Sequence, residues 1–234
     1  MNKINKLKIL PLLICLVLLT GCAKKVTSLT PTTIKNVKMT LTFASAPNLN
    51  QIEILIPLNS ASNPLTPIDA YPTQNPYILH NPKEINDSLL SGSGANTAGY
   101  FANIFNTWED CIVIRNNSAE IFNGSFVSTQ NINTLTASLT QIGNQVIVQF
   151  STSQLNANIQ SQSAIDGTIR YGIYTIDMAN GIHPYRMEDR LNNLNAFISL
   201  IVGTSFTDPD SGAEIQIAPL NPMADLLSVL VDIN

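Results

Sequence analysis

The chain has 234 residues, of which 44% are hydrophobic, 12% charged and 6% aromatic, and its formal net charge is −4. Globular proteins carry about 25% charged residues, so this chain has roughly half of the usual charge. The hydrophobic content excludes a disordered chain. The negative net charge excludes a basic nucleic-acid binder, and a total of three cysteines excludes a disulfide scaffold. The composition indicates a globular module.

The start of the chain has the pattern of a secretory targeting signal. Met1–Lys8 contains three lysines and no acid, Ile9–Leu19 is almost wholly apolar, and Thr20 and Gly21 precede Cys22. A basic start, a short apolar stretch and small residues before the cleavage point are typical of such signals. The apolar stretch is much shorter than the ~20 residues that a membrane-spanning helix needs.

The tetrapeptide Leu19-Thr20-Gly21-Cys22 resembles the lipobox of bacterial lipoproteins, and the resemblance covers residues 1–25 only. It implies that residues 1–21 are a cleaved signal peptide, that the Cys22 thiol receives a diacylglycerol, and that the new α-amine is acylated. Several acyl chains give a stable anchor, whereas one chain binds a membrane only marginally. We therefore expect a protein of the bacterial cell envelope, anchored in the outer membrane or the cell membrane, with its body on the non-cytoplasmic side.

Cleavage changes the charge of the chain. Residues 1–21 hold three lysines and no acid, so the mature chain would have nine basic and sixteen acidic residues, a net charge of −7. Such a body is repelled by an anionic membrane surface, so we expect the lipid to provide the membrane contact. Residues 22–36 are polar and Thr-rich after the lipidated cysteine, which predicts a flexible tether. Cys111 is the one cysteine left unmodified, and its apolar surroundings predict a buried side chain.

The body, residues 37–234, has the pattern of an all-β domain. Val37–Phe43 alternates between apolar and polar residues, and 134–141 and 145–151 alternate on either side of Gly143-Asn144, which predicts a hairpin. Further strands are expected at 51–58, 100–105, 111–115, 120–126, 168–177, 215–217 and 227–231. Short strands separated by turn residues predict a single β-sandwich or jelly-roll-like domain. Two sandwiches divided near residue 100 are the alternative.

Three segments do not follow this pattern. Residues 59–99 contain five prolines within 64–82 and a glycine-rich run at 91–99, so we expect an extended excursion that is functional or hides short strands, such as one at 77–79. Leu191–Val202 fits a short helix, although a strand from Ala196 fits equally well. Met223–Ile233 is ambiguous in the same way.

Residues suited to catalysis are scarce. The chain has two histidines, His80 and His183, each beside a proline turn, and none of the common catalytic or phosphate-binding motifs. Both histidines are expected to be ordinary surface or turn residues. We therefore predict no catalytic residues, no enzyme activity and no cofactor other than the acyl lipid.

Two groups of residues are candidate ligand sites. Trp108-Glu109-Asp110, with Tyr77 as a further stacking surface, offers the aromatic ring and the carboxylates of a sugar site, although a tryptophan that caps the core is the simpler interpretation. Asp208, Asp210 and Glu214 surround a glycine turn and could supply part of the oxygen set of a structural Ca²⁺ ion. An exposed turn that leads into the 215–217 strand is the simpler interpretation there.

A second, weaker resemblance is to sandwich modules of the DOMON and family-9 carbohydrate-binding type. It depends on the strand-rich pattern, the Trp108-Glu109-Asp110 junction and Asp189-Arg190-Leu191. The sequence as a whole predicts a membrane-anchored envelope lipoprotein that presents a β-sandwich binding or structural module to an envelope protein or a glycan. A carbohydrate-binding module is the alternative, and an envelope enzyme that acts on glycans is a further one.

Overall fold

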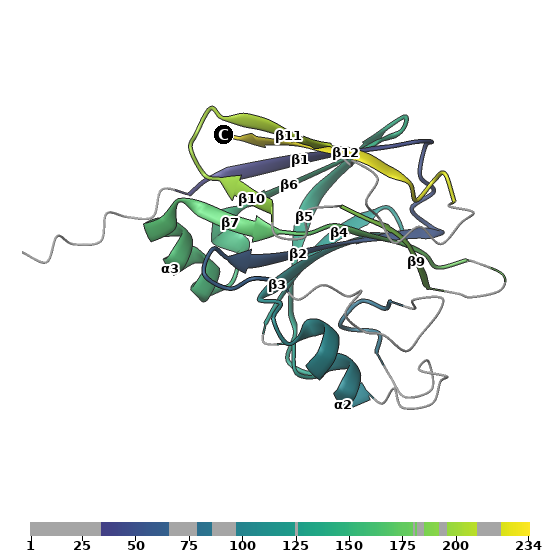
Figure 1. Ribbon diagram of the computed structural model, residues 1–234, viewed down its shortest axis with the longest axis horizontal. Coiled ribbons are helices and arrows are strands. Elements are labelled where there is room, and N and C mark those ends of the chain that lie inside the picture. Colours follow the sequence, from purple (N-terminus) through teal and green to yellow (C-terminus); the bar gives the residue numbers. More distant parts are fainter. Residues whose placement is uncertain are drawn as a thin grey trace, which may run out of the picture. The chain divides into compact units, whose positions relative to one another are not determined.

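The computed structural model describes residues 34–65, 79–85, 97–124, 126–179, 181, 185–191, 196–209 and 221–234 (Figure 1). The described part of Ile34–Asn234, which is one compact unit, contains twelve strands and a few short helices. The strands are β1 (Asn36–Phe43), β2 (Ile52–Ser60), β3 (Asp110–Arg115), β4 (Ser118–Asn123), β5 (Asn133–Ile142), β6 (Gln145–Ser151), β7 (Thr168–Tyr171), β8 (Tyr174–Asp177), β9 (Arg186–Arg190), β10 (Ala196–Ser199), β11 (Ser205–Pro209) and β12 (Leu226–Ile233). The helices are α2 (Thr97–Tyr100), the π-helix η2 (Phe101–Phe105), the 3-10 helix η3 (Thr152–Gln154) and α3 (Ala157–Asp166).

All strand pairs are antiparallel and form one sheet in the order β10-β7-β2-β3-β4-β5-β6-β1-β12-β11, with β8 paired to β2 and β9 to β8. β5 connects two layers, because Asn133–Ala137 pairs with β4 whereas Ser138–Ile142 pairs with β6. Figure 1 shows the layer of β1, β6, β11 and β12 lying over the layer of β2, β3 and β7. The all-β fold expected from the sequence is confirmed, as a curled sheet folded over its own core.

The main core lies between the two layers. Alternate residues of β1, namely Val37, Met39, Leu41 and Phe43, are fully buried and pack with apolar residues of β2, β6 and β12. Side chains of a strand point alternately to its two faces, so this alternation gives β1, β6 and β12 one apolar face each. The same alternation fixes the register, because a shift by one residue would turn the apolar set to the solvent.

A second core covers the opposite face of the lower layer. Phe101, Ile104 and Phe105 of η2 pack there with Leu55 of β2 and Val113 of β3, and Figure 1 shows α2 beneath this layer. β2 therefore lies between two cores, and all nine of its residues are buried. This explains why alternation fails at Leu55, since both faces of the strand require apolar side chains.

Several predicted elements are confirmed. The hairpin is β5 and β6, joined by Gly143 in the left-handed conformation (φ 59°), and the 37–43, 51–58 and 111–115 strands are β1, β2 and β3. The ambiguous C-terminal segment is the strand β12. β2 and β3 lie on either side of residue 100 in the sequence and pair directly, so the segments before and after that residue belong to one sheet. Cys111 is fully buried, as expected.

Other expectations are wrong. Residues 100–105 are helical, because Tyr100, Phe101, Ile104 and Phe105 are buried whereas Ala102 is exposed, which is the spacing of a helix that lies on the sheet. The expected strand 168–177 is divided at Gly172 into β7 and β8, which pair with successive parts of β2. The expected 120–126 strand is β4, which ends at Asn123, and the helical alternative at 191–202 is overturned by strand β10. The predicted strands at 77–79 and 215–217 fall outside the described residues apart from Leu79, which is not in a strand.

Five elements are not predicted by the sequence pattern, namely β9, β11, α2, η3 and α3. α3 has only two buried residues, Ile159 and Ser163, so it lacks the apolar stripe that identifies most helices. Its ends do carry recognisable signals. The Asn156 side chain accepts a hydrogen bond from the Ile159 amide at 2.9 Å, and Gly167 ends the helix in the left-handed conformation (φ 65°).

Candidate functional site

Trp108 belongs to the second core. Its ring is only 2% exposed and lies 4.8 Å from the Phe105 ring and 6.0 Å from the Tyr174 ring, with which it is stacked. Its Nε1 is buried and has no hydrogen-bond partner among the described residues. The sequence suggests Trp108 as a stacking surface for sugars, but its ring faces are occupied by neighbouring side chains. The ring therefore contributes to a ligand site at most as one wall.

Glu109, which lies in the segment after η2, accepts hydrogen bonds from the end of β2. Its Oε2 accepts a hydrogen bond from the Ser60 backbone amide at 2.6 Å. Its Oε1 accepts hydrogen bonds from the Ser60 hydroxyl at 3.2 Å, from the Asn63 side-chain amide at 3.3 Å and from the Asn158 side-chain amide. The Glu109 backbone amide donates to Asn59 Oδ1 at 2.9 Å. Charge-assisted hydrogen bonds of this kind are about twice as strong as neutral ones, so this carboxylate is strongly held by the fold.

Asp110, the first residue of β3, binds the residue that caps the N-terminus of α3. It is fully buried and accepts hydrogen bonds from the Asn156 backbone amide at 2.8 Å and from the Asn156 side-chain amide at 3.0 Å. Burial raises the pKa of the Asp110 carboxyl to about 7, while hydrogen bonds from Asn156 and Asn123 act in the opposite direction. Glu109 thus holds the end of β2, and Asp110 holds the start of α3, beside the first residue of β3.

A cavity of about 450 Å³ lies at this junction. Its wall is formed by Asn63 after β2, the loop after η2, the residues after β4 and the first turn of α3. The lining residues are Asn63, Asn106, Thr107, Trp108, Glu109, Gly124, Phe126, Val127, Asn156, Ala157 and Asn158. Glu109 is the one ionisable side chain among them. The volume is within the ~300–1,000 Å³ of typical small-ligand pockets.

The structure brings together only some of the predicted site residues. Trp108 and Glu109 line the same cavity. Asp110 does not line it, but it accepts a hydrogen bond from Asn156, which does. The asparagines of the cavity wall are not predicted by the sequence, although the N-cap pattern at Asn156 is a usable signal. Tyr77 and Cys22 lie outside the described residues. Their roles stay predictions.

The predicted calcium site is described only in part. Asp208 lies on β11, where its Oδ2 accepts a hydrogen bond from the Tyr171 hydroxyl at 3.2 Å, and Asp210 and Glu214 lie outside the described residues. Within the described part of the chain, no group of three or more His, Cys, Asp or Glu side chains is arranged to hold a metal ion. The calcium site stays a prediction.

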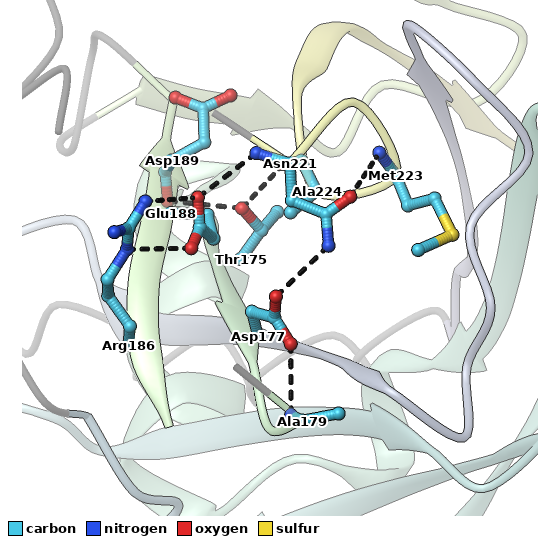
Figure 2. Close-up of polar contacts among 9 residues, drawn as sticks. All are labelled: Thr175, Asp177, Ala179, Arg186, Glu188, Asp189, Asn221, Met223 and Ala224. Atoms are coloured by element: carbon cyan, nitrogen blue, oxygen red, sulfur yellow. Dashed lines mark hydrogen bonds and ion pairs between the residues drawn. The ribbon is translucent and has the colours of Figure 1, made fainter. Parts of the chain in front are cut away.

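A second polar cluster joins β8 and β9 to the turn before β12 (Figure 2). Glu188 pairs with Arg186 at 2.7 Å and accepts the Asn221 backbone amide at 3.2 Å. The Asn221 side chain donates to Asp177 at 3.1 Å, and the Leu226 amide donates to Asp189 at 2.7 Å. These three carboxylates are almost fully buried and each accepts hydrogen bonds from fixed donors. Their arrangement holds the start of β12 in place.

A third cluster surrounds Glu53 of β2, which is fully buried. Glu53 Oε2 accepts a hydrogen bond from Asn81 at 3.0 Å and lies 3.5 Å from Arg115, which also pairs with Glu84. Burial raises the pKa of Glu53 to about 7, and the charge of Arg115 partly opposes this. The cluster connects residues 79–85 to the outer face of the sheet.

His80 lies in the same region, and its environment differs from the one expected from the sequence. The sequence predicts a surface or turn residue, but His80 is 2% exposed. Its ring lies 4.1 Å from the Tyr185 ring, and its backbone amide donates to the Tyr100 hydroxyl oxygen at 2.9 Å. Burial lowers the pKa of His80 to about 4, so the ring is neutral near pH 7.

No protein-family model, curated protein or solved structure matches this chain. Among the described residues, no helix is both long enough and apolar enough to cross a membrane.

Proposed function

We propose that the protein is a lipoprotein of the bacterial cell envelope, attached to a membrane through acylated Cys22. The observation that carries this proposal is the series of a basic start, the apolar stretch 9–19 and the tetrapeptide Leu19-Thr20-Gly21-Cys22. The net charge of −7 on the mature chain supports attachment through the lipid, because the body itself is repelled by anionic lipids.

The anchored body acts as a binding or structural module without catalytic activity. Carboxylates that serve as general acids or nucleophiles need a free oxygen directed toward the substrate. Instead, the carboxylates of Glu109, Asp177, Glu188 and Asp189 accept hydrogen bonds from backbone or side-chain donors that fix the fold. This use of the acids supports a module that recognises a partner without transforming it.

Carbohydrate binding is the second candidate, and the cavity beside Trp108 favours it. The cavity has the volume of a small-ligand site and a wall rich in amides. A glycoside hydrolase is less well supported, because that chemistry uses two carboxyl groups on either side of the scissile bond. Among the residues that line the cavity there is one, Glu109.

The anchor is tested by substitution of single cysteines in the intact precursor. Cys22→Ser removes the thiol that is acylated, while Cys15→Ser makes the same change within the apolar stretch and is the matched control. In bacteria fed labelled palmitate, we expect label in the parent and in Cys15→Ser but none in Cys22→Ser. Only the two labelled proteins should enter the detergent phase on Triton X-114 partition. Equal labelling of Cys22→Ser, or an unlabelled parent, contradicts the proposal.

A further inference from the structure

The cavity beside Trp108 is a preformed site whose walls are fixed by hydrogen bonds. Asn156 donates to the Glu109 carbonyl at 2.8 Å, which holds the first turn of α3 against the loop after η2. The Gly124 amide donates to the same carbonyl at 3.4 Å, which positions the residues after β4. Asn63 donates to the Thr107 carbonyl at 3.2 Å and closes the side toward β2. A ligand that enters this cavity meets walls that are already ordered.

The polar groups of the wall determine which ligands fit. Four asparagines line the cavity, and two of them, Asn63 and Asn156, already donate both of their side-chain N–H groups to the fold. The exposed side chains of Asn106 and Asn158 are left to offer donors and acceptors to a ligand. There is no lysine, arginine or histidine among the lining residues to pair with an anion. The single carboxylate, Glu109, already accepts hydrogen bonds from Ser60, Asn63 and Asn158, which reduces its attraction for a cation.

Trp108 belongs to the cavity wall but offers a ligand little surface. The residue is only 2% exposed, it contributes to the cavity wall, and its Nε1 has no acceptor among the described residues. That nitrogen is closed off from the cavity as well as from solvent, so a ligand between these ordered walls does not reach it. The exposed side chains of Val127 and Ala157 give the wall the apolar surface that the ring carbons of a sugar can contact.

We propose that this cavity binds a neutral, hydroxyl-rich ligand, specifically a saccharide unit, with the side chains of Asn106 and Asn158 as its hydrogen-bonding groups. The inference rests on the proposed function, because it assigns a ligand class to the anchored binding module. It differs from recognition by a stacking tryptophan, since the ring of Trp108 is packed against Phe105 and Tyr174.

The chain contains a single tryptophan, which lies in the cavity wall, so its fluorescence reports on changes at this cavity. We would titrate the mature acylated protein, in a detergent without a sugar head group, with glucose, galactose, mannose and N-acetylglucosamine. Glucuronate serves as an anionic comparison. We expect a saturable change of Trp108 fluorescence with at least one neutral sugar, with a Kd of about 1 mM or below, and no response to glucuronate.

Two variants of α3 make the test specific. Ala157→Phe places a large side chain in the cavity wall, whereas Ala164→Phe makes the same change at another exposed position of α3 that does not line the cavity. We expect Ala157→Phe to weaken sugar binding by more than about tenfold and Ala164→Phe to bind as the parent does. Thermal unfolding of both variants verifies that the fold is retained.

Each result supports or overturns the assignment. Binding that is lost in Ala157→Phe and kept in Ala164→Phe supports it. A response that persists in Ala157→Phe places the ligand elsewhere and overturns it. The absence of a response to every neutral sugar, or equal binding of glucuronate, overturns the ligand class. None of these results alters palmitate labelling at Cys22, so failure of the sugar site is distinguishable from failure of the proposed anchor.

Discussion

Glu53→Gln tests whether the buried acid beneath residues 79–85 destabilises the fold when it ionises. Burial raises the pKa of Glu53 from 4.5 to about 7. A carboxyl whose pKa is higher in the folded state contributes stability that is fully present below pH ~4.5 and is lost as the pH rises through ~7. Because a tenfold change in proton affinity corresponds to about 1.36 kcal/mol, ionisation of Glu53 removes about 3 kcal/mol of stability.

Glutamine keeps an oxygen that can accept from Asn81, but it cannot ionise. We expect the unfolding free energy of Glu53→Gln, relative to the parent, to increase by about 3 kcal/mol between pH ~4.5 and pH ~8 in urea titrations. Asp110 and His80 titrate in both proteins, so their contributions cancel in the difference. Glu120→Gln, the same change at a half-buried position of β4, is the control for loss of one carboxylate. If the difference in unfolding free energy between Glu53→Gln and the parent stays constant with pH, ionisation of Glu53 does not destabilise the fold.

Three further predictions concern buried groups. Asn156→Ala removes the cap of α3 and the side-chain donor to Asp110, so urea titration should show a loss of about 2–4 kcal/mol, against little change for the exposed helix variant Ser161→Ala. Cys111, which is fully buried, should react with a thiol reagent only after unfolding; rapid reaction of the native protein would contradict this. The His80 ring should titrate in NMR spectra near pH 4, and a midpoint near ~6.5 would show that it is solvated.

The elements that the sequence predicts correctly have one face in the core and one in solvent. β1 and the β5–β6 hairpin alternate because each has a single buried face, and the turn at Gly143-Asn144 needs the left-handed conformation that glycine allows. β2 is harder to interpret, because cores on both faces remove the alternation. Residues 100–105 resemble a strand, since a short apolar stretch does not distinguish the two periods. Their helical spacing is visible only once the sheet beneath them is known.

The candidate site could be predicted only in part, for a different reason. The junction of an aromatic residue and two acids is local, so the sequence identifies Trp108, Glu109 and Asp110. Their partners are remote along the chain: Ser60 and Asn158 each lie 49 residues from Glu109. Polar residues in turns and on a helix without an apolar stripe give no period that would point to a common cavity. The sequence therefore identifies Glu109 and Asp110 as candidate site residues. It does not show that they accept hydrogen bonds from remote parts of the fold.

These contacts connect the cavity wall to several separate elements of the domain. Trp108 joins this wall to the second core, Glu109 joins it to β2, and Asp110 joins it to α3. A change in the wall is therefore resisted by several elements of the sheet, and ligand binding requires little ordering of the chain. The same coupling means that substitution of Glu109 or Asp110 lowers stability and binding together. Ala157, which is exposed and has no polar side-chain atom, is the position where binding can be changed while the fold is kept.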